Sequence, residues 1–459
     1  MVTYQDLLAV GENEKERMKF VRSTINQHKT TELYKIADIA EDYDRHRNRT
    51  IMEYQKLIYT VMGEAIPDVW TANYKLASRF FNRFITQENQ YLLSNGVMWE
   101  NEATADKLGD DFDTKLQEAG LKALRGGVSF GYFELDHMQV FGITEFAPLY
   151  DEENGALRAG IRFWQIDDSK PLRATLYEED GYTDYIWNRK NKDDYEGAIL
   201  HDKRPYIEKI VVSKADGERI FDGENYPSFP IVPLWGNPHH QSELVGLREQ
   251  IDCYDLIKSG YANNVDEASI VYWTLQNAGG MDDIDLAKFI EKMRNLHAAQ
   301  TDDNVTATPN TMDAPYASRE ALLATLRADL YEDAMALDTK NISNGATTAT
   351  QIEAAYEPLN SKVDQYEYCV IEFIKGILKI AGIEDKPSFT RSRIVNTQEN
   401  IQVLLQCGSY LSEDYITQKL LDYLGDGDKA EQMIAERIAN ETPMIAEEQL
   451  LNEQVSEVE

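Results

Sequence analysis

Hydrophobic positions in the first hundred residues recur at the spacing of an α-helix. The first apolar stripe comprises Leu33, Ile36, Ala40 and Tyr43, and the second comprises Leu76, Phe80, Phe84 and residues 91–93. Positions three and four apart lie on one face of a helix, so both stripes predict amphipathic helices with one buried side. Gly96 follows the second stripe at a position typical of a helix stop. Residues 1–100 are therefore predicted to be mainly helical.

Between residues 125 and 235 the pattern changes to short apolar or alternating runs. The runs are GGVSFGYFELD, AGIRFWQI, RATLYEEDG and YIEKIVVSKADG. Glycines and Asp-Gly pairs separate them, as is typical of β-strands joined by tight turns. The glycine-rich segment 126–131 lacks the following helix that a phosphate-binding loop needs, so we interpret it as a tight turn before a strand. The proline-rich segment 227–238 is interpreted as an exit from this region, since proline is excluded from helix interiors.

Helical spacing of apolar residues then returns in three long segments. These segments are 242–267, 318–337 and 351–381. The first of them would be about 39 Å long at the rise of an α-helix. Pro358 lies inside the third segment and is expected to kink it near its start, and Gly382 is expected to end it.

The segments around these long helices are shorter and more polar. Residues 268–317 read as a compact module, with the strand IVYWTLQN, the small helix DIDLAKFIEKMRNL and the polar run DDNVTATPN. Residues 338–350, DTKNISNGATTAT, form a polar loop. Residues 385–440 predict an extended piece and two or three helices, and the acidic tail 441–459 is expected to be disordered. The fold class predicted is α+β and mainly helical.

Charge changes the picture of possible partners. The chain has 46 Lys and Arg residues against 80 Asp and Glu residues, which gives a formal net charge of −34. A protein that grips DNA usually presents a basic stripe to the phosphates, and this composition argues against one. Charge alone therefore favours a soluble acidic protein, or a protein that handles nucleic acid without gripping it.

Compartment and membrane signals are sparse. Cys253, Cys369 and Cys407 lie far apart and fit neither a disulfide framework nor a metal pattern. The first residues show no basic segment followed by an apolar one, so no signal peptide is expected. No apolar run is long enough for a membrane span. A reducing cytoplasm is the expected place of synthesis.

Motifs for catalysis are also missing from the sequence. It contains no G-x-x-x-x-G-K-[ST] loop and no H-E-x-x-H pair, and its 7 histidines are scattered. Asp110, Asp111 and Asp113 could bind a divalent cation, but a run of acids before a helical segment is more often a solvated helix start. We therefore predict no catalytic residue, no metal and no cofactor.

Five segments along the chain form a recognisable series. They are EDYDRHRNRTI (41–51), NYKLASRFFNRFITQENQYLLSNGV (73–97), FPIVPLWGN (229–237), SELVGLREQIDCYDLIKSGYANNVDE (242–267) and SNGATTATQIEAAYEPL (343–359). In this order they resemble the portal proteins of tailed bacteriophages with long, non-contractile tails. The order of the segments around a helix–module–helix–loop–helix core carries the resemblance. The loop departs from the family pattern Ser-Gly-x-Ala-Leu, because it reads Asn-Gly-Ala-Thr over 344–347.

The resemblance implies a portal architecture within the α+β class. Its parts would be a mixed α/β wing over 1–241, stem helices at 242–267 and 318–337, a small α/β clip at 268–317, a tunnel loop at 338–350, a long wing helix at 351–384 and a helical crown at 385–440. The tail 441–459 matches nothing in the family.

The same resemblance implies a ring-forming subunit of the head-to-tail channel. The ring would contain about twelve copies and would lie at the capsid vertex of the virion, after assembly in the host cytoplasm. Double-stranded DNA would be packaged and ejected through it. The implied partners are the terminase (the packaging ATPase), the major capsid and scaffolding proteins and a head–tail connector, with no membrane.

The tunnel loop supplies the candidate DNA-channel residues. They are Lys340, Asn341, Ser343, Asn344, Thr347 and Thr348. Small polar groups with a single positive charge suit brief contacts with the backbone of DNA that slides past them. Many strong contacts to phosphates would add up and stall the DNA. Without the resemblance, an ordinary surface connection between two helices is the simpler interpretation.

Two other classes of protein remain open on the sequence. One is a different structural head protein, such as a connector or a minor capsid component. The inserted module between two long helices favours a portal over a shell protein. The other is a metal-dependent hydrolase that uses Asp110, Asp111 and Asp113.

Overall fold

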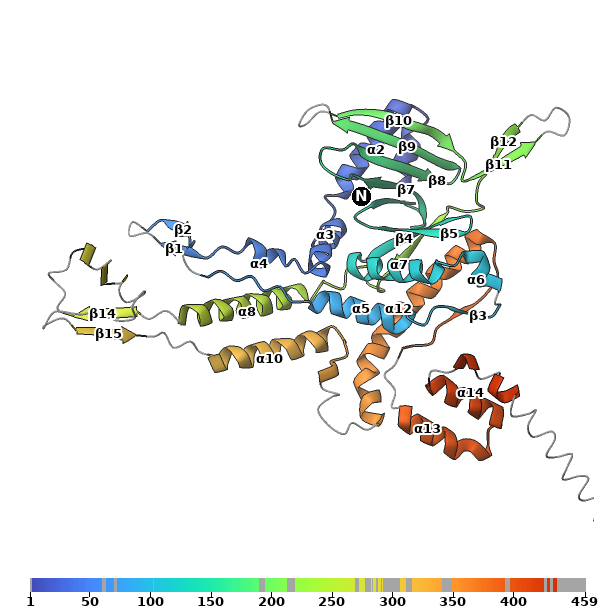
Figure 1. Ribbon diagram of the computed structural model, residues 1–459. Coiled ribbons are helices and arrows are strands. Elements are labelled where there is room, and N and C mark those ends of the chain that lie inside the picture. The colour runs from blue at the N-terminus through green and yellow to red at the C-terminus, as the bar shows by residue number, and fades with distance from the viewer. Residues whose placement is uncertain are drawn as a thin grey trace, which may run out of the picture. The chain divides into compact units, whose positions relative to one another are not determined.

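A computed structural model describes the protein over most of its length. The described residues are 2–59, 63–69, 72–101, 103–189, 195–212, 219–268, 272–276, 282, 284–285, 288–289, 291, 306–310, 316–340, 349–392, 397–424, 427–429 and 432–435. They belong to two compact units, one drawn from 1–337 and 358–391 and the other from 338–357 and 392–459. Helices and strands are both abundant (Figure 1), so the predicted α+β class is confirmed.

The N-terminal part of the first unit is built from capped helices. They are α1 (Tyr4–Val10), α2 (Glu14–His28), α3 (Glu32–Asp44), α4 (Arg49–Glu53) and α5 (Phe80–Leu93). Side chains of Thr3, Asn13, Thr31 and Asn48 accept bonds from the first free N–H groups of α1 to α4, which fixes where each helix begins. The predicted helices are confirmed.

Short strands interrupt this helical region and correct the prediction for it. They are β1 (Leu57–Tyr59), β2 (Ala65–Pro67) and β3 (Met98–Trp99). Helix α5 begins at Phe80, after Leu76, and ends at Leu93, before Gly96. Gly96 has a φ of 73° in the turn that follows the helix. Three residues are too few for periodicity to show, so these strands carry no sequence signal.

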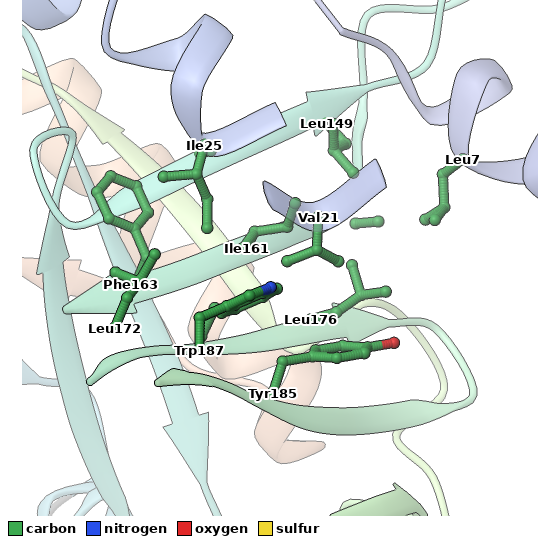
Figure 2. Packing of buried hydrophobic residues seen from close by; sticks show 13 residues of the cluster. Leu7, Val21, Ile25, Leu149, Ile161, Phe163, Leu172, Leu176, Tyr185 and Trp187 are labelled. Atoms are coloured by element: carbon green, nitrogen blue, oxygen red, sulfur yellow. The ribbon is translucent and has the colours of Figure 1, made fainter. Parts of the chain in front are cut away.

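An antiparallel five-stranded sheet forms the first core. Its strand order is β10-β9-β8-β7-β6, with bounds β6 (Phe146–Tyr150), β7 (Leu157–Trp164), β8 (Leu172–Glu178), β9 (Gly181–Arg189) and β10 (Tyr195–Arg204). Figure 2 shows Val21 and Ile25 pointing from α2 toward Ile161 and Trp187 of the sheet. All four side chains are buried. Each such side chain contributes about 1.5–3 kcal/mol when it leaves water, so α2 is fixed to the sheet.

A three-stranded sheet of order β13-β4-β5 lies next in the unit. Its strands are β4 (Val128–Glu134), β5 (His137–Gly142) and β13 (Ile231–Trp235), and α7 (Phe112–Gly126) packs on it. Gly127 has a φ of 87° between α7 and β4, so the tight turn predicted over 126–131 is confirmed. The proline-rich segment 227–238 contains strand β13. Its Pro233 is tolerated because β13 is an edge strand, where a missing N–H does not interrupt the sheet.

The remaining elements of this body are small. Helix α6 (Ala103–Leu108) precedes α7, and β11 (Ile207–Val212) pairs with β12 (Arg219–Glu224) in an antiparallel hairpin. Strand β16 (Pro387–Ser388) pairs with β3. The predicted strands at AGIRFWQI, RATLYEEDG and YIEKIVVSKADG are confirmed as β7, β8 and β11.

The three long helices are present with shifted ends. They are α8 (Arg248–Ala268), α10 (Tyr316–Asp333) and α12 (Ala349–Ala381), with β14 (Tyr272–Gln276) and β15 (Thr306–Asn310) paired between the first two. The polar run that ends TATPN thus contains a strand. Helix α8 begins six residues after Ser242, because Gly246 adopts a φ of 88° that no helix contains.

Helix α12 contains Pro358 and ends where the sequence predicts. Gly382 adopts a φ of 68° and its N–H donates to the carbonyl of Lys379 at 3.4 Å, while the N–H of Ile383 donates to that of Leu378 at 2.9 Å. This is a Schellman motif, which needs a left-handed residue at the position that glycine fills. The predicted helix stop at Gly382 is confirmed.

Short helices make up the described part of the C-terminal segment of the second unit. They are α13 (Thr397–Gln406) and α14 (Glu413–Leu424), with 3₁₀ turns at Cys407–Ser409 and Gly427–Lys429. The tail 441–459 and much of the module 268–317 lie outside the described residues. Among the helices that the structure describes, none combines the length and the hydropathy that a bilayer crossing requires.

Candidate functional site

Helices α8 and α10 lie side by side and run in opposite directions (Figure 1). At one end, the amide of Gln250 donates to the carboxylate of Asp333. At the other end, the rings of Tyr261 and Tyr316 meet edge to face at 5.6 Å between centroids. The first contact joins the start of α8 to the end of α10. The second joins the C-terminal half of α8 to the start of α10. The pair is therefore an antiparallel rod that extends from the body.

An extended segment, residues 72–79, lies along the opposite side of α8, and we call it the strap. The N–H of Ser78 donates to Asp255 Oδ1 at 3.0 Å, that of Leu76 to Ser259 Oγ at 2.9 Å and that of Tyr74 to Asn263 Oδ1 at 2.7 Å. Two residues of extended chain advance about 6.6 Å and four residues of helix advance about 6 Å. Because these steps nearly match, every second N–H of the strap meets the next side chain along α8.

The polar face of α8 also holds the N-terminal helices at its base. Asn48 Nδ2 donates to Asp255 Oδ2 at 3.0 Å, Thr50 Oγ1 donates to Asp252 Oδ2 at 2.7 Å, and the hydroxyl of Tyr43 donates to Asp252. Burial raises the pKa of Asp255, which is fully buried. Burial and the Asp252 carboxylate raise the pKa of Tyr43 to about 12. Both side chains are bound by several partners, as buried polar groups must be.

An aromatic cluster fixes the base of the rod to α5. Phe80 meets Tyr254 of α8 at 5.0 Å and Phe84 meets Tyr331 of α10 at 5.2 Å, both edge to face. The guanidinium of Arg83 donates to the Tyr331 hydroxyl at 2.6 Å. Such aromatic pairs add about 0.5–1.5 kcal/mol each beyond their buried area. Beyond this cluster, the described stretch of α10 from Tyr316 to Asp329 has no buried residue.

A tight turn connects α10 to the predicted tunnel loop. The N–H of Ala336 donates to the carbonyl of Tyr331 at 2.9 Å, and that of Met335 to the carbonyl of Glu332 at 3.0 Å. Met335 adopts a φ of 51°, the left-handed conformation that glycine usually supplies. This turn ends α10 at Asp333, so the expectation that the helix continues to Leu337 is wrong.

Only one of the six candidate loop residues falls within the described part of the chain. Lys340 is exposed, and its N–H donates to Asp338 Oδ1 at 3.1 Å. Asn341, Ser343, Asn344, Thr347 and Thr348 lie outside the described residues. Their role in a channel stays a prediction.

The three carboxylates considered for a metal site lie at a helix start. Asp111 takes the N-cap position of α7, and Asp110 and Asp113 are exposed. Asp113 Oδ1 accepts the N–H of Val97 at 3.2 Å, so this carboxylate ties the turn after α5 to α7. The helix-start interpretation is confirmed. In the portion of the chain that the structure describes, no group of three or more His, Cys, Asp or Glu could hold a metal ion.

The functional residues that sequence reasoning missed are those of the strap contact. Asp255, Ser259 and Asn263 recur every four residues on α8, opposite its apolar stripe. That polar periodicity was a usable signal for a second, polar partner. The strap itself shows no comparable pattern.

The described residues form a mixed α+β body with an antiparallel pair of long helices and the strand pair β14–β15 between those helices in the chain. This order of elements is the one expected for a ring-forming structural protein with a stem and an inserted clip. The family model described as "Phage portal protein, SPP1 Gp6-like" matches residues 16–443. The chain belongs to this family of phage portal proteins. This match rules out the alternative that the chain is another structural head protein, such as a connector or a minor capsid component.

Two relatives of the chain are themselves named portal proteins. The chain is 23% identical over 368 residues to the portal protein of Clostridium phage phiCD119, covering 72% of this chain and 78% of the relative. It is 22% identical over 390 residues to the portal protein of Bacillus phage SPP1, covering 78% and 74%. A solved chain from the neck of an empty gene transfer agent particle is similar with a TM-score of 0.44 and 9% identity, covering 75% of this chain and 90% of that chain.

Proposed function

We propose that copies of this chain close into a ring of about twelve subunits with an axial channel for double-stranded DNA. The observation that carries the proposal is the match of the portal family model across residues 16–443. The exposed length of α10 supports it, because a helix that buries so little within its own chain is stabilised by a neighbour. Heterologous contacts that repeat around an axis close into a ring.

In this proposal each segment has a place in the ring. Residues 1–241 and 351–384 form the wing, 242–267 and 318–337 the stem, 268–317 the clip, 338–350 the tunnel loop and 385–440 the crown. The strap and the aromatic cluster support the assignment of a stiff stem, since they attach α8 and α10 to the body at several points.

The charge of the chain suits transit of DNA rather than binding. A net charge of −34 per copy would repel the phosphates and keep a duplex near the axis. Each attractive phosphate contact would instead release counterions and deepen the binding, and copies around a ring would multiply that effect. Lys340 and its polar neighbours would then make the few direct contacts.

The proposed partners follow from the same role. They are the terminase that supplies ATP hydrolysis, the major capsid and scaffolding proteins, and a head–tail connector. The chain would act as a conduit without catalysis of its own, in keeping with a structural family. Assembly would take place in the host cytoplasm.

Deleting residues 341–347 tests the channel role directly. We expect rings to assemble as in the wild type, because the contacts of α8, α10 and the strap are untouched, and we expect DNA packaging or retention to fail. A matched variant replaces 341–347 with a Gly-Ser segment of the same length, which separates loop chemistry from loop length. Collapse of ring assembly in both variants would make the loop structural and contradict its role in transit.

A further inference from the structure

Four elements converge on one buried ammonium group at the end of α10. Lys362 of α12 has only 17% of its side chain exposed. Its Nζ lies 2.9 Å from Glu88 Oε2 on α5 and 2.6 Å from Glu243 Oε2 in the segment before α8. It also donates to the carbonyl of Ala334 at 3.2 Å. The ammonium of Lys362 therefore forms ion pairs with two carboxylates and a hydrogen bond with one carbonyl oxygen.

The carbonyl of Ala334 is one that helix geometry leaves open. The last carbonyls of a helix have no intrahelical N–H partner, and they carry the negative end of the helix dipole. A lysine at this place supplies both a donor and a positive charge. Glu243 is itself held in place, because Asn237 Nδ2 donates to its Oε1 at 2.7 Å. Lys362 therefore links the end of α10 to a fixed part of the body.

A second contact holds the next residues from the other side. Gln87, the neighbour of Glu88 on α5, donates from Nε2 to the carbonyl of Leu337 at 3.2 Å. Its Oε1 accepts the N–H of Leu337 at 3.0 Å. One side-chain amide thus satisfies both backbone groups of the residue that precedes the tunnel loop. Gln87 and Lys362 together hold the turn 334–337 from α5 and α12.

The chemistry of the cluster fits positioning better than stability. Glu88 is buried, and burial raises its pKa, while the charge of Lys362 opposes that rise. Burying an ion cluster costs desolvation energy, so it is often no more stabilising than apolar side chains of the same volume. What such a cluster provides is a fixed geometry. Beside it lies a cleft of about 470 Å³, lined by Glu88, Glu243, Asp333, Met335 and Lys362 among others.

We propose that Lys362 and Gln87 are positioning residues that set where the tunnel loop leaves the stem. The proposal rests on the channel function proposed above for residues 338–350. The left-handed backbone conformation of Met335 is unfavourable for a residue other than glycine. Lys362 and Gln87 stabilise the turn that contains it. Without them the turn 334–337 opens locally while the rest of the body stays folded.

Hydrogen–deuterium exchange on the assembled full-length protein tests this. Gln87→Ala, and Lys362→Met combined with Glu88→Gln, are compared with the wild type. The double variant avoids leaving two carboxylates without their cation. We expect amides of residues 335–340 to exchange about tenfold faster or more, with no change in the five-stranded sheet. Lys375→Met, an exposed lysine of the same helix that pairs with Glu372, is the control and leaves exchange unchanged.

Lys362→Arg provides the conservative rescue, since a guanidinium can also bridge two carboxylates and a carbonyl. It should restore slow exchange of residues 335–340. Unchanged exchange in both variants within intact rings would overturn the proposal, as would faster exchange spread over the whole body. If the double variant does not assemble, Gln87→Ala alone decides the question. Failure of the loop deletion to affect DNA would remove the channel role but leave this exchange result standing.

Discussion

At the scale of single residues, Gly120 shows how closely the helices of the body approach. A Cβ at this position would lie 2.1 Å from both Asn89 Oδ1 and Tyr366 Oη. Those two atoms are hydrogen-bonded to each other at 2.9 Å inside the core. Only glycine lets α7 approach this buried pair, so the packing of three helices depends on the absence of one methyl group.

We expect Gly120→Ala to lower the free energy of unfolding by about 3 kcal/mol, since it overpacks the site and breaks a buried hydrogen bond. Urea unfolding of the dissociated subunit measures this. Gly260→Ala is the matched control, because nothing lies within 4 Å of its Cβ in α8. Alanine in a helix should stabilise by about 0.5–1 kcal/mol there. Equal stability of the two variants would contradict the role given to Gly120.

His28 is the residue through which pH should act on the five-stranded sheet. It is buried, its Nε2 lies 2.8 Å from the carbonyl of Ile143, and burial lowers its pKa. Because the folded pKa is below the unfolded value of 6.5, the unfolded state takes up the proton first. The contribution of His28 to stability is therefore complete above that value and is lost as pH falls below it.

His28→Gln tests this pH dependence, since a Gln amide can still donate to Ile143. Unfolding free energies of wild type and variant, measured from neutral pH downward, should converge as the solution becomes acidic. A constant difference across the same range would show that His28 does not titrate on unfolding. The buried Glu88 and Asp255 also make the stability depend on pH. Both are present in the wild type and in the variant, so their contributions cancel in the difference between the two free energies.

At the scale of elements, the strap explains why α8 can extend from the body as a rigid helix. Its three bonds tie residues 74–78 to side chains that are distributed over more than two turns of α8. Each neutral hydrogen bond contributes about 0.5–1.5 kcal/mol net. The sum is enough to hold an extended segment that has no strand partner.

Ser259→Ala with Asn263→Ala should therefore release the outer part of the strap. We expect limited proteolysis to cut within residues 72–77 in the double variant and not in the wild type, while the thermal midpoint of the body changes little. Thr325→Ala, at an exposed position of α10, serves as the control, since its hydroxyl donates to the Ala321 carbonyl of its own helix. A double variant as resistant to cleavage as the wild type would show that other contacts hold the strap.

The sequence predicted these elements unevenly, for physical reasons. Long periodic segments such as 351–381 were located within two residues, because a core stripe of a long helix repeats many times. Strand β13 was missed, because two prolines in and beside it hide a short edge strand. The start of α8 was placed six residues early, since apolar residues of the preceding turn, such as Leu244, continue the helical spacing.

The site was less predictable than the fold. Lys362 sits among polar and charged residues that are typical of an exposed helix face, and its partners come from positions 88, 243 and 334, so no local pattern indicates the cluster. The order of segments along the chain did predict the family, because that order reflects the topology of the whole fold. Contacts between residues that are far apart in the sequence leave no comparable pattern in it.

At the scale of the whole molecule, a strongly acidic chain carries a helix, α10, whose described outer part is not buried. Net charge of −34 on each copy disfavours close assembly unless apolar or complementary contacts offset the repulsion. The described part of α10 offers such a surface, since Leu322 is exposed and no residue from Tyr316 to Asp329 is buried. A ring provides each copy with a neighbour on both sides and leaves no surface unpaired.

The central claim is that this chain forms a closed ring around a channel wide enough for a DNA duplex. Negative-stain electron microscopy of the purified full-length protein tests it most directly. We expect rings of about twelve subunits with an axial hole at least about 20 Å across, enough for a duplex with its grooves. Stable monomers at every protein concentration, or closed particles without an axial hole, would contradict it.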